Sequence, residues 1–259
     1  MTTGDAATAY GRFTGRFSEA LAQEFVTALA PHLQGRVLDV GCGPGALTAR
    51  LVERLGAQSV AGADPSEPFV EAARARLPGV DVRCAPAERL PFDDDTFDVA
   101  VAQLVVHFMT DPVAGLREMA RVTRPGGIIA ACVWDNAGER GPLSPLWQAA
   151  HELDPAVGDE SAAVGAREGQ LAEVATLAGL VDVQSSSVTA HVPFSDVEEW
   201  WAPLAAGVGS GGAFVTRLDD RHRAALRELI GRRFGPGPFT ADATAWCVTA
   251  RVPYPAGGA

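Results

Sequence analysis

The chain has 259 residues, of which 47% are hydrophobic and 20% charged, so it can bury one large core or two modest ones and is not a disordered segment. Its 32 acidic and 21 basic residues give a formal net charge of −11, which argues against a protein that tracks nucleic-acid phosphates. The sequence contains no Lys, and this excludes Schiff-base chemistry, Lys general bases and phosphate loops of the GK[ST] type.

Neither a targeting signal nor a membrane span is evident. The stretch 1–11 has no basic run followed by an apolar one, and the longest apolar stretch, 99–109, is too short to cross a bilayer. The four cysteines are widely spaced without a C-x-x-C pair, so we expect reduced, buried thiols. We therefore expect a cytoplasmic protein with no metal, no membrane partner and no nucleic-acid partner.

Helix and strand periodicities alternate over the first half of the chain. Phe17, Leu21, Phe25 and Leu29 recur every fourth residue and predict an amphipathic helix that ends near Pro31. Short apolar runs then predict five buried strands, with helices between them. The predicted strands are 36–40, 59–63, 80–84, 97–106 and 128–134, and the predicted helices are 47–55, 66–77 and 112–124. This alternation predicts a parallel sheet with right-handed crossovers.

The second half is less regular. A short helix is expected around 146–147, a longer one over 170–180, and an alternating, half-buried strand over 181–192. A capping box at 195–198 predicts the start of a further helix, and the glycine-rich stretch 207–212 predicts a flexible joint. A helix over 221–234 and a last strand over 245–252 complete the pattern.

A glycine-rich turn directly follows the first predicted strand. Asp39 lies near the end of that strand, Gly41-Cys42-Gly43-Pro44-Gly45 forms the turn, and a helix begins at once. Such glycines let the backbone approach a ligand, and the helix N-terminus offers unpaired N–H groups to an anion. Asp64 ends the second strand, where an acidic residue hydrogen-bonds a ribose diol. Together these elements predict a ligand that contains a nucleoside.

The turn also fits the dinucleotide fingerprint G-x-G-x-x-A, but two features argue against a dinucleotide. The Asp39 carboxylate would repel a pyrophosphate and would suit a ligand with a cationic end, such as an ammonium. The chain also lacks a second mononucleotide-binding half with its own phosphate turn.

The residues of the turn resemble motif I of the class I S-adenosylmethionine-dependent methyltransferases. Three further blocks match this family in order and spacing: 62–66, 87–92 running into 97–99, and 116–122 through 124–127. The match covers about residues 35–134 and resembles the methyltransferase type 11 group, whose relatives include quinone-biosynthesis C-methyltransferases. The resemblance implies an α/β, Rossmann-like fold with a central, mostly parallel seven-stranded sheet, an antiparallel last strand, helices on both faces and a partly helical lid.

The resemblance also implies a division of the chain. Residues 1–34 would form a helical leader over the cofactor, 35–134 the cofactor-binding core, and 135–259 the rest of the sheet with its lid. Within that last part, the remaining sheet is expected at about 170–192 and 244–252. The lid insertions, which would bind the methyl acceptor, are expected at about 135–165 and 194–240.

The resemblance implies S-adenosyl-L-methionine as cofactor, with S-adenosyl-L-homocysteine as product, and assigns roles to matching positions. Asp39 and the turn at Gly41, Cys42, Gly43 and Gly45 would hold the methionine moiety, and Asp64 the ribose hydroxyls. Pro65 and Ser66 would flank the adenine, Ala87 and Glu88 would meet its edge, and Gln103 and Leu104 would lie under the sulfonium. Many relatives have Gly-Asp-Ala where this chain has Ala85-Pro86-Ala87, so the usual side-chain contact to the adenine amino group is lost or shifts to Glu88 or a backbone carbonyl.

The stretch 9–17 is similar to a leader of some type 11 members, which folds over the cofactor. Tyr10 and Phe13 would then close the pocket, and Arg16 would reach a carboxylate. An ordinary helix leader with its Arg in solvent fits the same residues equally well.

We expect a small-molecule methyl acceptor, bound by the lid insertions. Four of the five Trp lie between 134 and 201, which predicts an apolar lid over a small aromatic or polyketide-like acceptor. The candidate substrate-binding residues are His107, Trp134, Trp147, His151, Trp200, Trp201 and Phe214. The alternative is that the lid uses these aromatic residues as its own core.

Methyl transfer from a sulfonium is an in-line displacement with a neutral leaving group, so it depends mainly on orientation and the exclusion of water. If the acceptor must lose a proton, His107, just past the fourth strand, is the candidate general base, and the alternative is a packed histidine. The sequence thus predicts an S-adenosylmethionine-dependent methyltransferase. The alternative functions are a non-catalytic protein that binds this cofactor and an NAD-dependent oxidoreductase. The acceptor and the oligomeric state do not follow from the sequence.

Overall fold

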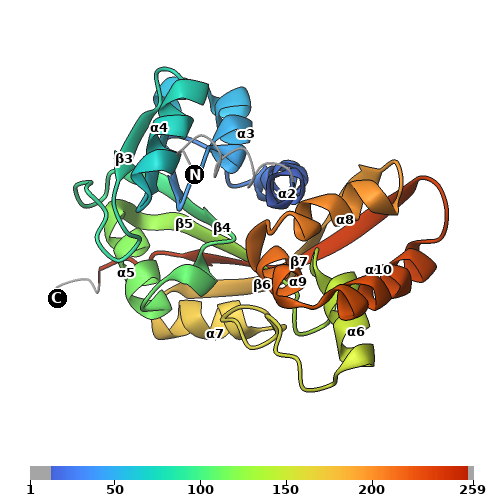
Figure 1. Cartoon of the computed structure of the whole chain (residues 1–259). Helices are drawn as coiled ribbons and strands as arrows, with labels where there is room; N and C mark the ends of the chain where they lie inside the picture. The colour runs from blue at the N-terminus through green and yellow to red at the C-terminus, as the bar shows by residue number, and fades with distance from the viewer. Residues whose placement is uncertain (1–12, 256–259) are drawn as a thin grey trace.

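A seven-stranded sheet organises the chain in the computed structural model, which describes residues 13–255 (Figure 1). The strand order is β3-β2-β1-β4-β5-β7-β6, and β7 runs antiparallel to both of its neighbours while the other pairs are parallel. The strands are β1 (Val37–Val40), β2 (Val60–Asp64), β3 (Asp81–Cys84), β4 (Phe97–Gln103), β5 (Thr123–Trp134), β6 (Val181–Phe194) and β7 (Phe239–Arg251). The predicted mixed sheet with an antiparallel last strand is therefore confirmed.

Helices cover both faces of this sheet, as the alternating pattern predicts (Figure 1). One face packs against α2 (Thr14–Leu29), α3 (Ala46–Leu55) and α4 (Glu67–Arg76), and the other against α5 (Pro112–Val122) and α7 (Gln170–Leu177). Successive residues of β1 point to opposite faces, so Val37 joins the first core and Leu38 the second.

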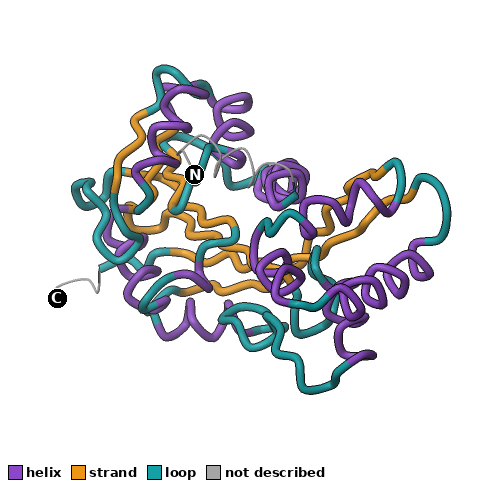
Figure 2. The backbone as a smooth tube through the Cα atoms, viewed as in Figure 1, coloured by secondary structure: helices purple, strands orange, loops and turns teal. Residues whose placement is uncertain are grey.

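The remaining helices form a separate layer around the far ends of β6 and β7. They are α6 (Ser144–Leu153), α8 (Val197–Ala205), α9 (Gly209–Arg217) and α10 (Asp220–Phe234). β6 and β7 stay paired out to Phe194 and Phe239, whereas β5 ends opposite Ala245, so the two long strands project beyond the rest of the sheet beneath these helices (Figure 2). Of the helices in the described ranges, none combines the length and apolarity needed to cross a membrane.

Several strand boundaries differ from the prediction. β7 begins at Phe239 and not at 245, and β6 ends at Phe194 and not at 192. β4 ends at Gln103 rather than at 106, because Leu104 adopts a left-handed φ of +61° and turns the chain into the short 3₁₀ helix η2 (Val106–Phe108). β5 begins at Thr123, before the Pro-Gly-Gly that was expected to separate helix and strand.

Two features of the helical layer were also predicted wrongly. The N-cap of α8 is Asp196, which accepts from Glu199 N, so the capping box lies one residue later than expected. The glycine-rich stretch 207–212 is not a flexible joint, since its second half begins α9. Gly211 and Gly212 are buried there, and a Cβ on Gly212 would lie 2.4 Å from the Gly207 backbone. Close packing, rather than flexibility, explains these glycines.

Candidate cofactor site

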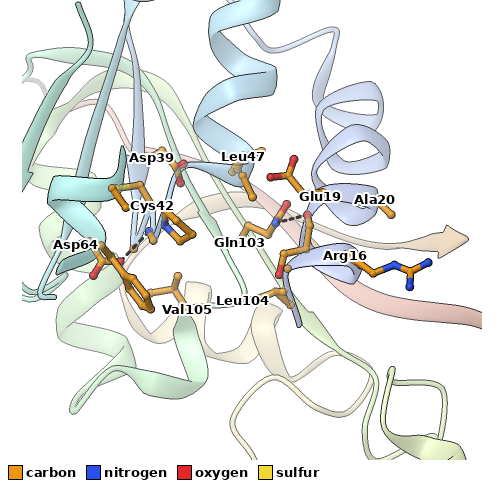
Figure 3. A pocket seen from close by; sticks show the side chains of 18 of the residues that line it. Arg16, Glu19, Ala20, Asp39, Cys42, Leu47, Asp64, Gln103, Leu104 and Val105 are labelled. Atoms are coloured by element: carbon orange, nitrogen blue, oxygen red, sulfur yellow. Dashed lines mark hydrogen bonds between the residues drawn. The ribbon is translucent and has the colours of Figure 1, made fainter. Parts of the chain in front are cut away.

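A cavity of about 960 Å³ opens at the carboxyl ends of β1, β2 and β4 (Figure 3). The β1–α3 glycine turn and the β2–α4 turn form one side, and the N-terminal half of α2 covers the other. Part of α4 and residues 191–193 of β6 complete the lining. Its volume is in the range of small-molecule and cofactor sites, and the carboxyl edge of a parallel sheet is where such folds bind ligands.

The three glycines of the turn serve different purposes, although all have positive φ: +71° at Gly41, +52° at Gly43 and +89° at Gly45. A Cβ on Gly41 would lie 2.2 Å from Val105 Cγ2, and one on Gly45 would lie 2.9 Å from Leu77 Cδ1. These two glycines are therefore required by packing within the protein. A Cβ on Gly43 would meet no atom within 4 Å, so this position leaves open space in the cavity wall.

Asp64 joins the two turns. Its carboxylate accepts one hydrogen bond from Gly43 N at 2.8 Å and another from Ser66 N at 2.9 Å. Burial raises the pKa of Asp64, and these two backbone donors oppose that rise. Since each carboxylate oxygen can accept a further bond, Asp64 remains able to bind hydroxyl groups in the cavity.

Asp39 is the most deeply buried acidic residue of the cavity, with 1% of its surface exposed. Thr48 Oγ1 donates to Asp39 Oδ2 at 2.6 Å, and no Arg or His of residues 13–255 forms an ion pair with this carboxylate. Burial raises the pKa of Asp39 to about 7, and the nearby Asp64 adds to the rise. A cationic ligand group could therefore pair with Asp39 without displacing an Arg or His side chain.

The end of β4 contacts three neighbouring segments through consecutive residues. Gln103 Nε2 donates to Ser18 O on α2 at 3.0 Å, and Leu104 N donates to Cys132 O on β5 at 2.8 Å. Val105 packs against Gly41 of the glycine turn. Most of the predicted cofactor-binding residues border this cavity: Asp39, Gly41, Cys42, Gly43, Asp64, Pro65, Ser66, Gln103 and Leu104. Gly45, also predicted, does not border it.

Ala87 and Glu88 do not border the cavity, so the structure gives no support to their predicted contact with adenine. The Glu88 carboxylate instead accepts from Thr110 N at 2.7 Å and from Asp111 N at 3.3 Å, next to the start of α5. It satisfies backbone N–H groups near the N-terminus of that helix.

The leader residues are also placed differently from the prediction. Tyr10 lies outside the described residues. Phe13 is buried against Trp200, with ring centroids 5.5 Å apart, and does not border the cavity. Arg16 borders it, but its guanidinium pairs with Glu199 at 2.8 Å and points away from Asp39 and Cys42 (Figure 3). Arg16 thus links α2 to α8 through Glu199 and does not contact Asp39.

Neither histidine candidate borders the cavity as residues 13–255 define it. Burial lowers the pKa of His107 to about 4, and its Nδ1 has no hydrogen-bond partner in this part of the chain. The neighbouring Phe108, 79% exposed, borders the cavity in its place. His151 Nε2 lies 2.9 Å from Val157 O within the helical layer. His107 therefore fits the alternative of a packed histidine better than the role of a general base.

The aromatic residues predicted to bind the acceptor form core packing instead. Trp134, Trp147, Trp200 and Trp201 are all buried, and Phe214 packs against Trp147 with centroids 5.2 Å apart. In the described structure, none of the five contributes to the cavity wall. The alternative, that the lid uses them as its own core, is the one that this packing supports.

Sequence reasoning missed part of the lining. α2 contributes Ser18, Glu19 and Ala20, and α4 contributes Phe69, Ala72 and Arg76. The α4 residues follow a spacing of three and four, which marks one face of a helix but does not show what that face covers. The α2 residues carry no local signal, because only the fold brings Ser18 beside Gln103.

The strand order, with β7 alone antiparallel to its neighbours, is that of a Rossmann-like class I methyltransferase fold. Comparison with known proteins agrees. Residues 38–131 match the family described as "Methyltransferase domain", the type 11 group. This stretch of the chain is therefore similar to the methyltransferase domains of that family.

Individual relatives support this assignment. An uncharacterized methyltransferase of Mycobacterium tuberculosis is 38% identical over 140 residues, which cover 54% of this chain and 54% of that protein. The demethylmenaquinone methyltransferase of Clavibacter sepedonicus is 38% identical over 129 residues, covering 49% and 50%. The chain spans about half the length of the curated relatives it matches. A putative methyltransferase from Bacillus halodurans shares the fold, with a TM-score of 0.56 and 17% identity over 90% of this chain and 100% of that one.

Proposed function

We propose that this protein binds S-adenosylmethionine in the cavity and transfers the methyl group to a small-molecule acceptor. The observation that carries the proposal is the open space at Gly43, set between the buried carboxylates of Asp39 and Asp64. Asp39 suits the ammonium of the cofactor's amino-acid end, and Asp64 suits its ribose hydroxyls.

The cofactor supplies a methyl group already activated by a positively charged sulfur, so the protein's task is orientation and exclusion of water. The apolar side chains of Leu104 and Val105 lie at the end of β4 on the cavity wall. Burial and the two aspartates raise the pKa of the Cys42 thiol, and this thiol therefore stays protonated and a poor nucleophile beside an electrophilic ligand.

We place an apolar or aromatic acceptor next to Leu104 and Phe108. Phe108 offers an exposed ring at the cavity wall, and the name of the Clavibacter relative, demethylmenaquinone methyltransferase, is consistent with a ring-containing acceptor. We place this activity in the cytoplasm, on acceptors that are neither nucleic acid nor membrane.

The test of the cofactor site compares two glycines that share a positive φ and open space around a Cβ. Gly43 and Gly56 both have positive φ, and a Cβ on either would meet no atom within 4 Å. Only Gly43 borders the cavity. Gly43→Ala would fill space needed by the ligand, while Gly56→Ala would introduce backbone strain away from the site.

Calorimetric titration with S-adenosylhomocysteine should show binding to the wild type and to Gly56→Ala, and binding weaker by about tenfold or more in Gly43→Ala. NAD should not bind. Equal affinity in all three proteins, or a preference for NAD, would contradict the proposed site.

A second candidate function is cofactor binding without methyl transfer. The observation in its favour is that His107, the histidine predicted as a base, does not border the cavity in the described structure. A panel of phenols, carboxylic acids and amines incubated with methyl-labelled S-adenosylmethionine separates the two. Label on any acceptor supports the transferase, and tight binding without transfer to the whole panel supports the second function.

A further inference from the structure

The last strand of the sheet, β6, has one edge that no other strand of the described structure covers. β6 follows β7 at the end of the strand order, and β7 is its only strand partner within residues 13–255. In such a strand, alternate residues point their N–H and C=O groups away from the sheet, where they can pair with another chain. This edge is therefore a candidate for binding by strand addition.

The middle of β6 lacks the features with which proteins usually protect such an edge. Residues 183–189 read Val-Gln-Ser-Ser-Ser-Val-Thr, with no charged residue, no Pro and no Gly, although 20% of the chain is charged. None of these residues is buried, and 184–187 are all exposed, so both faces of the strand are open to solvent there. A charge, a proline or a covering element would normally prevent pairing with a further strand.

Protective features do occur, but only at the two ends of β6. The register with β7 shifts between Val181 and Gln184, and Asp182 within this bulge has a left-handed φ of +51°. At the other end, Pro193 has no N–H to donate, and Arg16 of α2 donates to its carbonyl. The edge is thus left open only along the run 183–189, which has Ser186 at its centre.

We propose that two copies of this chain pair through β6, in antiparallel register about a two-fold axis at Ser186. Such an axis sets each residue of 183–189 opposite a residue of the same run, so the open edge of one copy covers the open edge of the other. The pairing forms about six to eight main-chain hydrogen bonds, which is within the range of specific protein interfaces. It joins the two sheets into one continuous sheet.

A second copy suits this edge better than a partner of different chemistry. The run offers no charge for an acidic or a basic partner to recognise, and its own copy is equally uncharged. The serines at 185–187 are small, so the two strands can approach without bulky side chains at the axis. The net charge of −11 on each copy opposes association over longer distances, so the dimer should be weak and should tighten as salt screens this repulsion.

The experiment measures self-association of the whole chain by sedimentation equilibrium, without any ligand. Ser186→Glu places two like charges opposite each other at the axis, and Ser186→Arg does the same with the opposite sign. Ser161→Glu is the matched control, because Ser161 is an exposed serine outside β6. The melting temperature of each variant shows that it is folded.

The wild type should form a dimer with a Kd of roughly 1–100 μM, and this Kd should fall as the salt concentration rises. Ser186→Glu and Ser186→Arg should each weaken the dimer by about fivefold or more, whereas Ser161→Glu should leave it unchanged. An equal mixture of the two Ser186 variants should dimerise again, because opposite charges then meet at the axis.

Crosslinking at the axis gives a second readout that does not depend on the charged variants. With the exposed Cys84 replaced by Ser, the three cysteines that remain are buried. In that background, Ser186→Cys should form a covalent dimer with oxidised glutathione, because residues opposite each other in antiparallel strands are close enough for a disulfide. Ser161→Cys should stay monomeric under the same conditions.

A wild type that stays monomeric at the highest concentration it reaches would overturn the proposal and leave the edge to solvent or to another protein. A dimer that both Ser186 variants leave intact, or equal crosslinking of Ser161→Cys, would place the interface elsewhere and overturn it too. None of these readouts involves the cofactor, so their outcome is separate from that of the proposed function.

Discussion

Ligand affinity should depend on pH through Asp39. Its carboxyl is buried without a cationic partner in residues 13–255, and its pKa in the ligand-free protein is about 7. An ammonium beside it favours the ionised form, so binding must remove the proton wherever one is present. The experiment therefore changes only the pH, between 8 and 6.

The magnitude follows from the fraction of Asp39 that is ionised before binding. With a pKa of about 7, that fraction is about 0.9 at pH 8 and about 0.1 at pH 6. If only the ionised form binds, affinity falls about tenfold over this range, which is about 1.4 kcal/mol. At pH 7, binding should release about half a proton.

Calorimetry with S-adenosylhomocysteine measures both quantities, using buffers of different ionisation heat to count protons. Asp39→Asn is the control, because its amide oxygen can still accept from Thr48 Oγ1 but does not titrate. The variant should bind more weakly at pH 8 and show no pH dependence. Equal wild-type affinity at pH 6 and pH 8, or the same pH dependence in the variant, would refute the reasoning.

The same pKa shift predicts the sign of a stability effect. The folded pKa of about 7 lies above the reference value of 3.8, so the folded state binds the proton more tightly than the unfolded state. The contribution of Asp39 to stability is therefore complete below pH 3.8 and is lost as the pH rises through 7. Ligand-free Asp39→Asn should melt above the wild type at pH 8, and a lower melting temperature would contradict this.

Three further predictions concern single side chains. Asp64→Ala removes the acceptor of Gly43 N and Ser66 N and should weaken S-adenosylhomocysteine binding by about 1–3 kcal/mol. Unchanged affinity by calorimetry would exclude a role of Asp64 in binding. Burial lowers the pKa of His107 to about 4, so protonation of His107 favours the unfolded state and stability should drop as the pH falls from 6.5 to 4. In His107→Gln, the melting temperature should change less over this pH range. An NMR titration midpoint of His107 near 6.5 would contradict the prediction. Trp200→Ala should lower the free energy of unfolding by about 3–5 kcal/mol. Trp200→Phe should lower it much less, because the indole N–H has no hydrogen-bond partner in the described structure. Equal losses for the two variants in denaturant titrations would contradict this.

The sequence predicts well those features that depend on local pattern. The alternation of strands and helices, and the position of the glycine turn between Asp39 and Thr48, follow from periodicity and from residues that permit few conformations. The residues at the proposed cofactor end of the cavity were therefore predictable, since the carboxyl ends of parallel strands meet at one edge of the sheet.

The features that failed depend on tertiary packing. Aromatic residues at Trp147 and Trp200 are equally compatible with a ligand wall and with a core, and only the fold shows that they are core. Arg16 has a guanidinium suited to a carboxylate, and the carboxylate it contacts belongs to Glu199, which is 183 positions away. The contact of Gln103 with Ser18 is likewise invisible in either local sequence.

The most direct test of the account is a crystal structure of the protein with S-adenosylhomocysteine. The account predicts the ribose hydroxyls within hydrogen-bond distance of Asp64, and the amino-acid end beside Asp39 and the glycine turn. A ligand bound outside this cavity, or one with its two ends exchanged, would contradict it.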